Sequence, residues 1–215
     1  AAANKGPPLV ARGKSGLVGS VNHAKILISE TRFWESIMKG EYNDTGWYQT
    51  PGRIKKLPKL RLIYHENYAS LNGLPGLHQG IEAHRVADTV ISNAYTYTTQ
   101  ARYSDLILPC STRWERWASC EFISSTNNRE IQIYPVKVCE ELFECRDDQW
   151  IASEIAKRLE LDVQALFPLD RKQQYFNEIA GSRVICDDAA TYQPLVTITQ
   201  QDIDGWGVKG EPQQG

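Results

Sequence analysis

Short runs of apolar residues alternate with helical patterns through the first half of the 215-residue chain. Runs typical of buried parallel strands lie at 25–29, 60–64, 89–92 and 106–109. Apolar spacing predicts helices over 31–39, ending at Gly40, and over 77–86, while Thr98 or Thr99 can cap a short third helix. This alternation predicts an α/β fold: a doubly wound, mainly parallel, Rossmann-like sheet with helices on both faces.

The pattern changes after Pro109. Alternating segments at 121–125 and 130–134 flank asparagine-containing turn residues and predict a β-hairpin. Helices are expected from about 148 to 159 and from about 171 to 180, which adds a C-terminal hairpin and helical extension. The expected organisation is a flexible lead-in at 1–22, one α/β domain at 23–181 and a peripheral C-terminal extension at 182–215.

Composition and charge narrow the classes of function. Hydrophobic residues make up 41% and charged residues 23% of the chain, which is enough for a packed core. The net charge of −2 provides no basic footprint, so no nucleic-acid partner is expected. No stretch approaches the roughly 18 apolar residues of a membrane span, and no signal-peptide pattern opens the chain. The start at Ala1, without an initiator methionine, indicates a piece of something longer.

Metal ligands and nucleophiles are not evident in the sequence. The five cysteines include no pair at the two-residue spacing of a zinc or iron–sulfur site. This favours free thiols, although a disulfide between Cys139 and Cys145 stays open. The four histidines are scattered, and His78 and His84 do not share a helix face. We therefore expect neither a metal ligand nor a catalytic residue within this chain.

Polar side chains gather where the predicted strands end. The carboxyl ends of parallel strands form the preferred ligand crevice of a doubly wound sheet. Segments following these strands hold groups that can hydrogen-bond a nucleotide, among them Asn67, Ser92, Asn93 and Thr98. Two interpretations stay open: a nucleotide-like ligand, or residues that only form turns and caps. Neither GxGxxG nor GxxxxGK[ST] occurs, so neither NAD nor a nucleoside triphosphate is indicated.

The stretch from Thr89 to Pro109 resembles a signature of the molybdopterin oxidoreductases of the DMSO reductase type. The stretch ends in Ala-Arg-Tyr-Ser-Asp-Leu-Ile-Leu-Pro, which is similar to that family's Ala-x-Tyr-Ala-Asp-Ile-Val-Leu-Pro. The family has a glutamate six residues further on, and Glu115 stands at that position here. Asp148-Gln149-Trp150 and the helix after it resemble the family's Asp-x-Trp helix. The likeness covers about residues 24–165 and is nearest to the catalytic A subunits of DMSO reductases. It departs at the strand end, where Ser92-Asn93 replaces an acidic residue.

The resemblance implies a bis(molybdopterin guanine dinucleotide) cofactor with molybdenum, bound across several domains of a reductase for S- or N-oxides in anaerobic respiration. This chain would be the third, cofactor-binding domain, contributing to one guanine nucleotide, and would be inactive alone. Matching positions imply cofactor contacts at Asn67, Ser92, Asn93, Thr98, Asp105, Arg116 and Asp148. An acceptor such as Asp148 suits the guanine N1 and N2 hydrogens, whereas for Asp105 a role as a turn residue is an equal alternative.

The same resemblance implies partners outside this chain. They are the other domains of the catalytic subunit, with a 4Fe–4S centre in the parent protein, an iron–sulfur electron-transfer subunit and a membrane-anchor subunit. The parent would be membrane-associated or extracytoplasmic in a bacterium. From the residues alone, two other classes stay open: a stand-alone α/β module that binds a nucleotide or metabolite, and a structural interaction domain.

Overall fold

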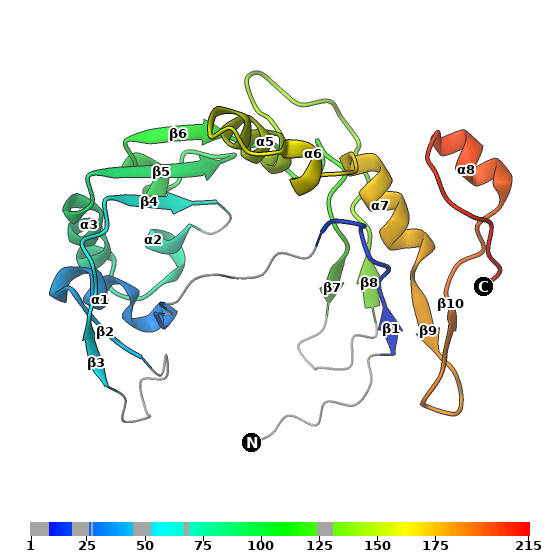
Figure 1. Cartoon of the computed structure of the whole chain (residues 1–215), viewed down its shortest axis with the longest axis horizontal. Helices are drawn as coiled ribbons and strands as arrows, with labels where there is room; N and C mark the ends of the chain where they lie inside the picture. The colour runs from blue at the N-terminus through cyan, green and yellow to red at the C-terminus, as the bar shows by residue number, and fades with distance from the viewer. Residues whose placement is uncertain (1–8, 19–25, 27, 45–52, 67–68, 124–130) are drawn as a thin grey trace. The chain divides into compact units, whose positions relative to one another are not determined.

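The computed structural model describes residues 9–18, 26, 28–44, 53–66, 69–123 and 131–215 (Figure 1). The chain forms two compact units. The parallel-sheet unit comprises 20–110 and 144–151, and the antiparallel unit comprises 1–19, 111–143 and 152–215. These units do not follow the expected divisions at residues 22 and 181. The assignment of residues 23–181 to one cofactor-binding domain stays a prediction.

Three parallel strands form the centre of the parallel-sheet unit. They are, in sheet order, β4 (Leu62–His65), β5 (Thr89–Ala94) and β6 (Leu106–Pro109). Ile63 pairs with Val90, and Ile91 pairs with Leu106. A parallel sheet flanked by helices confirms the predicted α/β class and is compatible with a Rossmann-like fold.

The strand predicted at 25–29 is not formed by those of its residues that the structure describes. Ile26, Ile28 and Ser29 have no strand pairing, and the chain continues into a 3-10 helix, η1 (Glu30–Arg32). A short apolar run fits a partly buried coil as well as a strand, so hydrophobic patterning does not separate the two.

Two helices and two single helical turns accompany the sheet in this unit. They are α1 (Phe33–Lys39), α2 (Ser70–Gly73), α3 (Leu77–Val86) and α4 (Thr99–Arg102). α1 ends at Gly40, whose φ of 66° is left-handed and therefore favours glycine. Thr98 caps α4, because its side-chain oxygen accepts a hydrogen bond from the Ala101 amide at 3.2 Å. An antiparallel ribbon of β2 (Glu41–Asn43) and β3 (Ile54–Lys56) also belongs to this unit.

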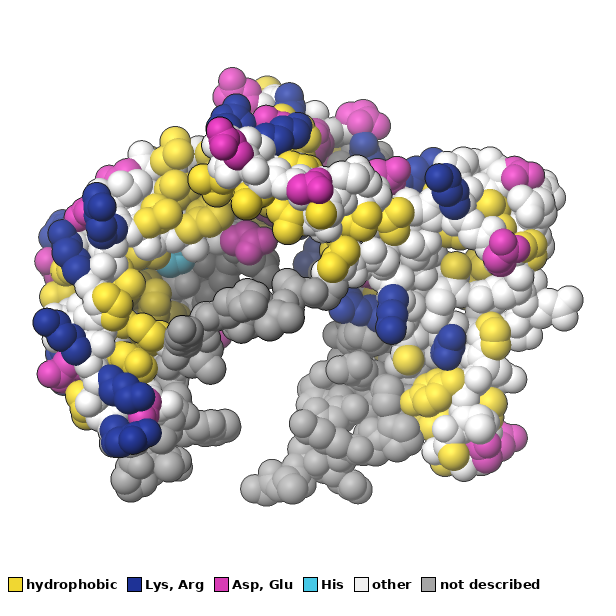
Figure 2. All heavy atoms as spheres, viewed as in Figure 1, with side chains coloured by type: hydrophobic (Ala, Val, Ile, Leu, Met, Phe, Trp, Pro, Cys, Tyr) yellow, Lys and Arg dark blue, Asp and Glu magenta, His cyan; other side chains and the backbone are white. Residues whose placement is uncertain are grey.

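One face of the sheet carries the core of the unit. Its buried apolar cluster joins strand and helix side chains: Trp34, Ile37, Ile63, Leu71, Ala83 and Val90. On the other face Leu62, Tyr64 and Leu106 are 53%, 40% and 48% exposed. Apolar side chains on the surface over the sheet are visible in Figure 2. The alternation of side chains along each strand thus leaves Tyr64 accessible at the surface.

Long-range antiparallel pairing organises the antiparallel unit. Strand β9 (Arg183–Ile185) pairs with β1 (Val10–Ala11) on one side and with β10 (Tyr192–Pro194) on the other. β1 lies in the segment expected to be a flexible lead-in, and β9 and β10 lie in the expected peripheral extension. The predicted hairpin after Pro109 is present, since β7 (Glu121–Ile123) pairs with β8 (Ile131–Ile133). Its turn, 124–130, lies outside the described residues.

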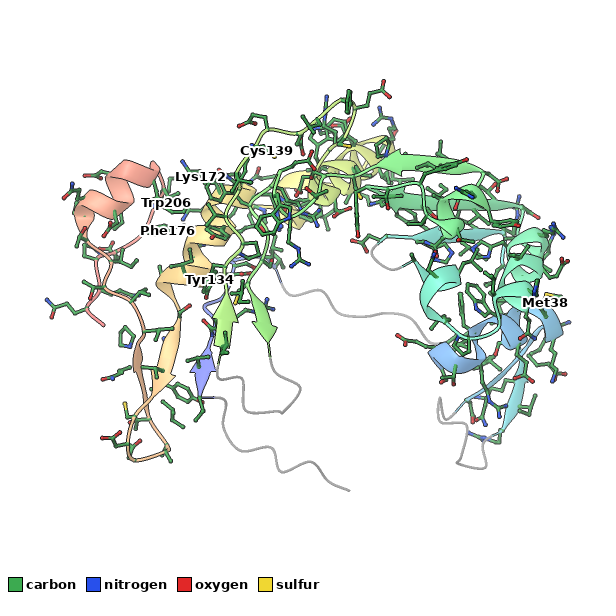
Figure 3. The ribbon with its side chains drawn as sticks, turned by 180° about the vertical axis from the view of Figure 1, so that it is seen from behind. Met38, Tyr134, Cys139, Lys172, Phe176 and Trp206 are labelled. Carbon is green, nitrogen blue, oxygen red and sulfur yellow. The ribbon has the colours of Figure 1, made fainter. Side chains whose placement is uncertain are left out.

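The remaining helices follow in the second half of the chain. They are α5 (Asp148–Arg158), α6 (Val163–Leu166), α7 (Arg171–Ala180) and α8 (Gln200–Trp206). α5 and α7 were predicted, and α5 begins in the parallel-sheet unit and ends in the antiparallel unit. Phe176 of α7 and Trp206 of α8, both labelled in Figure 3, have ring centroids 5.9 Å apart. Among the helices that the structure describes, none combines the length and apolar character that a membrane crossing requires.

Candidate functional site

The carboxyl end of the parallel sheet brings together two polar residues from distant parts of the chain. Asn93 lies near the end of β5, and Asp148 is the first residue of α5. The Asn93 Nδ2 donates a hydrogen bond to Asp148 Oδ1 at 3.0 Å, across 55 residues of sequence. Both side chains are half-buried, so a ligand at this edge can reach them. This is where a doubly wound sheet offers a ligand site.

Backbone pairing explains how Asp148 reaches this edge. Arg146 forms a parallel bridge with Cys110, and its amide donates to the Pro109 carbonyl at 3.1 Å. The chain before α5 therefore extends beside the end of β6 as a very short fourth strand. α5 then starts at the carboxyl edge, where a carboxylate in the first helical turn is favoured by the helix dipole.

Tyr64 of β4 adds a third side chain to the pair. Its hydroxyl donates to Asn93 Oδ1 at 2.9 Å. Burial raises the pKa of this hydroxyl, its hydrogen bond to Asn93 opposes the increase, and the carboxylates of Glu66 and Asp148 add to the increase. The hydroxyl is therefore protonated at neutral pH and remains a donor. Tyr64, Asn93 and Asp148 together are named the strand-end site.

Comparison with known proteins finds similar reductases over about half of this chain. No protein-family model matches the chain. It is 28% identical over 117 residues to a dimethyl sulfoxide/trimethylamine N-oxide reductase of Cereibacter sphaeroides, covering 54% of this chain and 14% of that protein. A protein of the same name from Rhodobacter capsulatus is 29% identical over 113 residues, which is 50% of this chain and 13% of the relative. This chain is related to the DMSO reductase family. It spans about one seventh of the length of these curated relatives.

The other contacts expected from the DMSO reductase resemblance do not all lie at this edge. Ser92 is 1% exposed, and its hydroxyl lies 2.7 Å from that of Ser104 inside the unit. Thr98 follows β5 and uses its side-chain oxygen to cap α4. Both residues therefore have a defined structural role, and a cofactor contact for either one stays a prediction.

Asp105 lies at the opposite edge of the sheet. Its Oδ2 accepts a hydrogen bond from the amide of Val90 at 2.7 Å. Asp105 precedes β6 and Val90 is the second residue of β5, so both mark the amino ends of the strands. The structure thus separates Asp105 from Asn93 and Asp148. The bond to Val90 fits the role of a turn residue, and a cofactor contact of Asp105 stays a prediction.

Two further expected contacts are not placed in the strand-end site. Asn67 lies outside the residues that the structure describes. Arg116 belongs to the antiparallel unit, whereas the residues of the strand-end site belong to the parallel-sheet unit. Their proposed contacts with a cofactor are therefore still predictions.

A buried histidine pair was not predicted from the sequence. His65 and His84 are 8% and 4% exposed, and their Nε2 atoms lie 2.9 Å apart. The sequence contained only a weak signal, a histidine at the end of a strand and another in the helix that follows. Among the described residues, no group of three or more potential ligands could hold a metal ion, and none of the five cysteines forms a disulfide.

Proposed function

We propose that this chain is part of a molybdenum oxidoreductase of the DMSO reductase type. In this proposal the strand-end site holds one guanine nucleotide of a bis(molybdopterin guanine dinucleotide) cofactor. The relationship to DMSO/TMAO reductases supports the oxidoreductase class. The observation that carries the proposal is the hydrogen bond between Asn93 and Asp148 at the carboxyl edge of the sheet.

The chemistry of the strand-end site fits a guanine base. Guanine presents two adjacent donors, N1–H and the 2-amino group, and an ionised carboxylate such as Asp148 is an acceptor with two oxygens. Adenine presents an acceptor at N1, so the same carboxylate would disfavour it. When bound, the cofactor would supply the redox chemistry at molybdenum, while these residues bind and orient its nucleotide.

The parent protein would need further parts. Under this proposal it reduces an S- or N-oxide in anaerobic respiration, with electrons arriving through a 4Fe–4S centre and an iron–sulfur subunit. A membrane-anchor subunit would hold it at the membrane or outside the cytoplasm. The present chain would contact the other domains of the catalytic subunit and would have no reductase activity alone.

Nucleotide binding by the 215-residue chain provides the test. We expect GDP and GMP to raise the melting temperature more than NAD does, because a ligand that binds only the folded state stabilises it. At 100 times the Kd, the stabilisation is about 2.7 kcal/mol. The Asp148→Asn variant should lose most of this shift, since the amide replaces an ionised acceptor.

A control variant removes the same charge at the amino edge of the sheet. Asp88 pairs with Lys59 at 2.8 Å and with Arg61 at 2.9 Å, just before β5. Asp88→Asn should keep the response to GDP. A clear preference for NAD would instead indicate a different nucleotide-binding module, and no response to any nucleotide would indicate a structural interaction domain. Either result would contradict the proposal.

A further inference from the structure

We propose that Tyr64 is a positioning residue that sets the preference of the strand-end site for 2-amino purines, guanine above all, over hypoxanthine. This inference rests on the proposed function. It starts from a chain of two hydrogen bonds, from Tyr64 Oη to Asn93 Oδ1 at 2.9 Å and from Asn93 Nδ2 to Asp148 Oδ1 at 3.0 Å. These hydrogen bonds link β4 to β5 and then β5 to the first residue of α5.

The direction of each bond follows from the groups involved. An ionised carboxylate only accepts hydrogen bonds, so the amide nitrogen of Asn93 faces Asp148. The amide oxygen must then face a donor, and the Tyr64 hydroxyl is that donor. The phenol therefore holds the amide plane of Asn93, and the amide in turn holds one oxygen of Asp148.

Sheet register makes this contact possible. Tyr64 pairs directly with Ile91, and Asn93 is two residues further along β5 on the same face. A long side chain can reach that diagonal neighbour across a strand pair. Tyr64 is 40% exposed, so its hydroxyl can be removed without opening the buried core.

Orientation of the carboxylate decides which purines bind well. Guanine offers N1–H and a 2-amino group side by side, whereas hypoxanthine offers N1–H alone. Both Asp148 oxygens meet both guanine donors only if the carboxylate plane is held. When the bond from Asn93 no longer fixes the plane, the bond to N1–H survives and the second bond weakens, so affinity for guanine falls towards that for hypoxanthine.

The experiment compares GDP with IDP, which differs only in lacking the 2-amino group. For the unmodified chain, we expect GDP to bind at least about tenfold more tightly, from one hydrogen bond to a charged group. Tyr64→Phe keeps the ring and should reduce this ratio to roughly twofold. Binding constants from isothermal titration calorimetry give the ratio, which a merely structural role of Tyr64 would not change.

Tyr95→Phe is the matched control, because Tyr95 immediately follows β5 and is 66% exposed. It should leave the ratio at the value of the unmodified chain. Asn93→Leu is the second variant and should also lower the ratio. Combined with Tyr64→Phe it should add little, since both changes break the same chain of bonds.

The outcomes separate the two proposals. If GDP binds, Asp148→Asn abolishes binding and Tyr64→Phe keeps the GDP-to-IDP ratio, the role of Tyr64 is wrong while the guanine site stands. If the unmodified chain binds neither nucleotide, both proposals are wrong. A ratio that falls in Tyr64→Phe and Asn93→Leu, but not in Tyr95→Phe, supports the positioning role.

Discussion

The facing nitrogens of His65 and His84 share one proton. The Nδ1 of His84 lies 2.7 Å from the Gly80 carbonyl, so this nitrogen carries a hydrogen and donates it. The Nε2 of His84 is then an acceptor, and the Nε2–H of His65 donates to it across 2.9 Å. A second proton between the facing nitrogens would place two N–H groups against each other in a buried space. A second proton on His65 at Nδ1 would keep this bond but would bury a positive charge, so the pair is favoured when both rings are neutral.

Acid should destabilise the chain through this pair. Burial, and then the neighbouring His84, lower the pKa of His65 from 6.5 to about 4, and burial also lowers the pKa of His84. The unfolded chain thus binds more protons between pH 6.5 and 4, so stability falls as the pH falls through this window. For His65 alone the loss is about 3 kcal/mol by pH 4.

Urea unfolding between pH 7 and 4.5 measures this loss. In His65→Asn, the slope of unfolding free energy against pH should be smaller than in the unmodified chain. His78 is exposed on α3, so His78→Asn should keep the original slope. Equal slopes in all three proteins would contradict the assignment to the buried pair.

At the same scale, the strand-end site could be predicted only in part. Asn93 was predicted because it ends a strand, and Asp148 through the resemblance. Tyr64 could not be predicted, because its bond to Asn93 depends on the pairing register of two strands. The position of Asp105 had a signal in the sequence, since this residue precedes a strand and so belongs to the amino edge of a parallel sheet.

At the scale of helices and strands, an element could be predicted where its pattern of apolar residues is continuous. The helix over 77–86 and the strands near 89–92 and 106–109 have continuous apolar patterns and are present. β1 and β9 have two and three residues, and their pairing joins segments more than 170 positions apart. Such short strands acquire stability from their partners, and no local pattern reveals the partner.

Gly80 of α3 lies where the helix packs so closely against its neighbours that a larger side chain would not fit. An added Cβ would lie 2.5 Å from Leu71 Cδ2 and 3.0 Å from Trp34 Cε2. Alanine usually stabilises a helix interior by up to about 1 kcal/mol relative to glycine. Here the crowding of two core side chains should outweigh that gain, and Gly80→Ala should destabilise the chain by roughly 1–3 kcal/mol.

The same substitution in another helix should change stability in the opposite direction. An alanine Cβ at Gly205 of α8 would meet nothing within 4 Å, so Gly205→Ala should stabilise by up to about 1 kcal/mol. Denaturant titrations of both variants measure the difference. If Gly80→Ala were as stable as the unmodified chain, α3 would not pack closely against Trp34 and Leu71.

At the scale of the whole molecule, the chain begins in the antiparallel unit, forms most of the parallel-sheet unit and then returns to the antiparallel unit. Residues near position 10 and near position 184 lie in the same sheet, and residues 20–110 form the other unit between them. Hydrophobic patterning along the chain does not show this return. It follows from long-range contacts such as the hydrogen bond from the Gly13 amide to the Glu178 carbonyl at 2.9 Å.

Gly13 and Gly181 lie where the N-terminal segment comes close to the end of α7. A Cβ on Gly13 would lie 2.5 Å from the Asn177 carbonyl oxygen and 2.6 Å from the Gly181 Cα. These are backbone atoms, which cannot rotate away as a side chain can. Gly13→Ala should therefore separate the N-terminal segment from α7 and destabilise the antiparallel unit by at least about 2 kcal/mol.

Hydrogen exchange locates this effect along the chain. In Gly13→Ala, amides of β1, β9 and the end of α7 should exchange faster, because exchange reports local opening. The exposed neighbour provides a control, since Lys14→Ala should leave these amides protected. Unchanged protection of β9 in Gly13→Ala would mean that the pairing of the two distant segments does not depend on their glycine contact. The pairing of β1 with β9 would then be enough to hold the N-terminal segment in this unit.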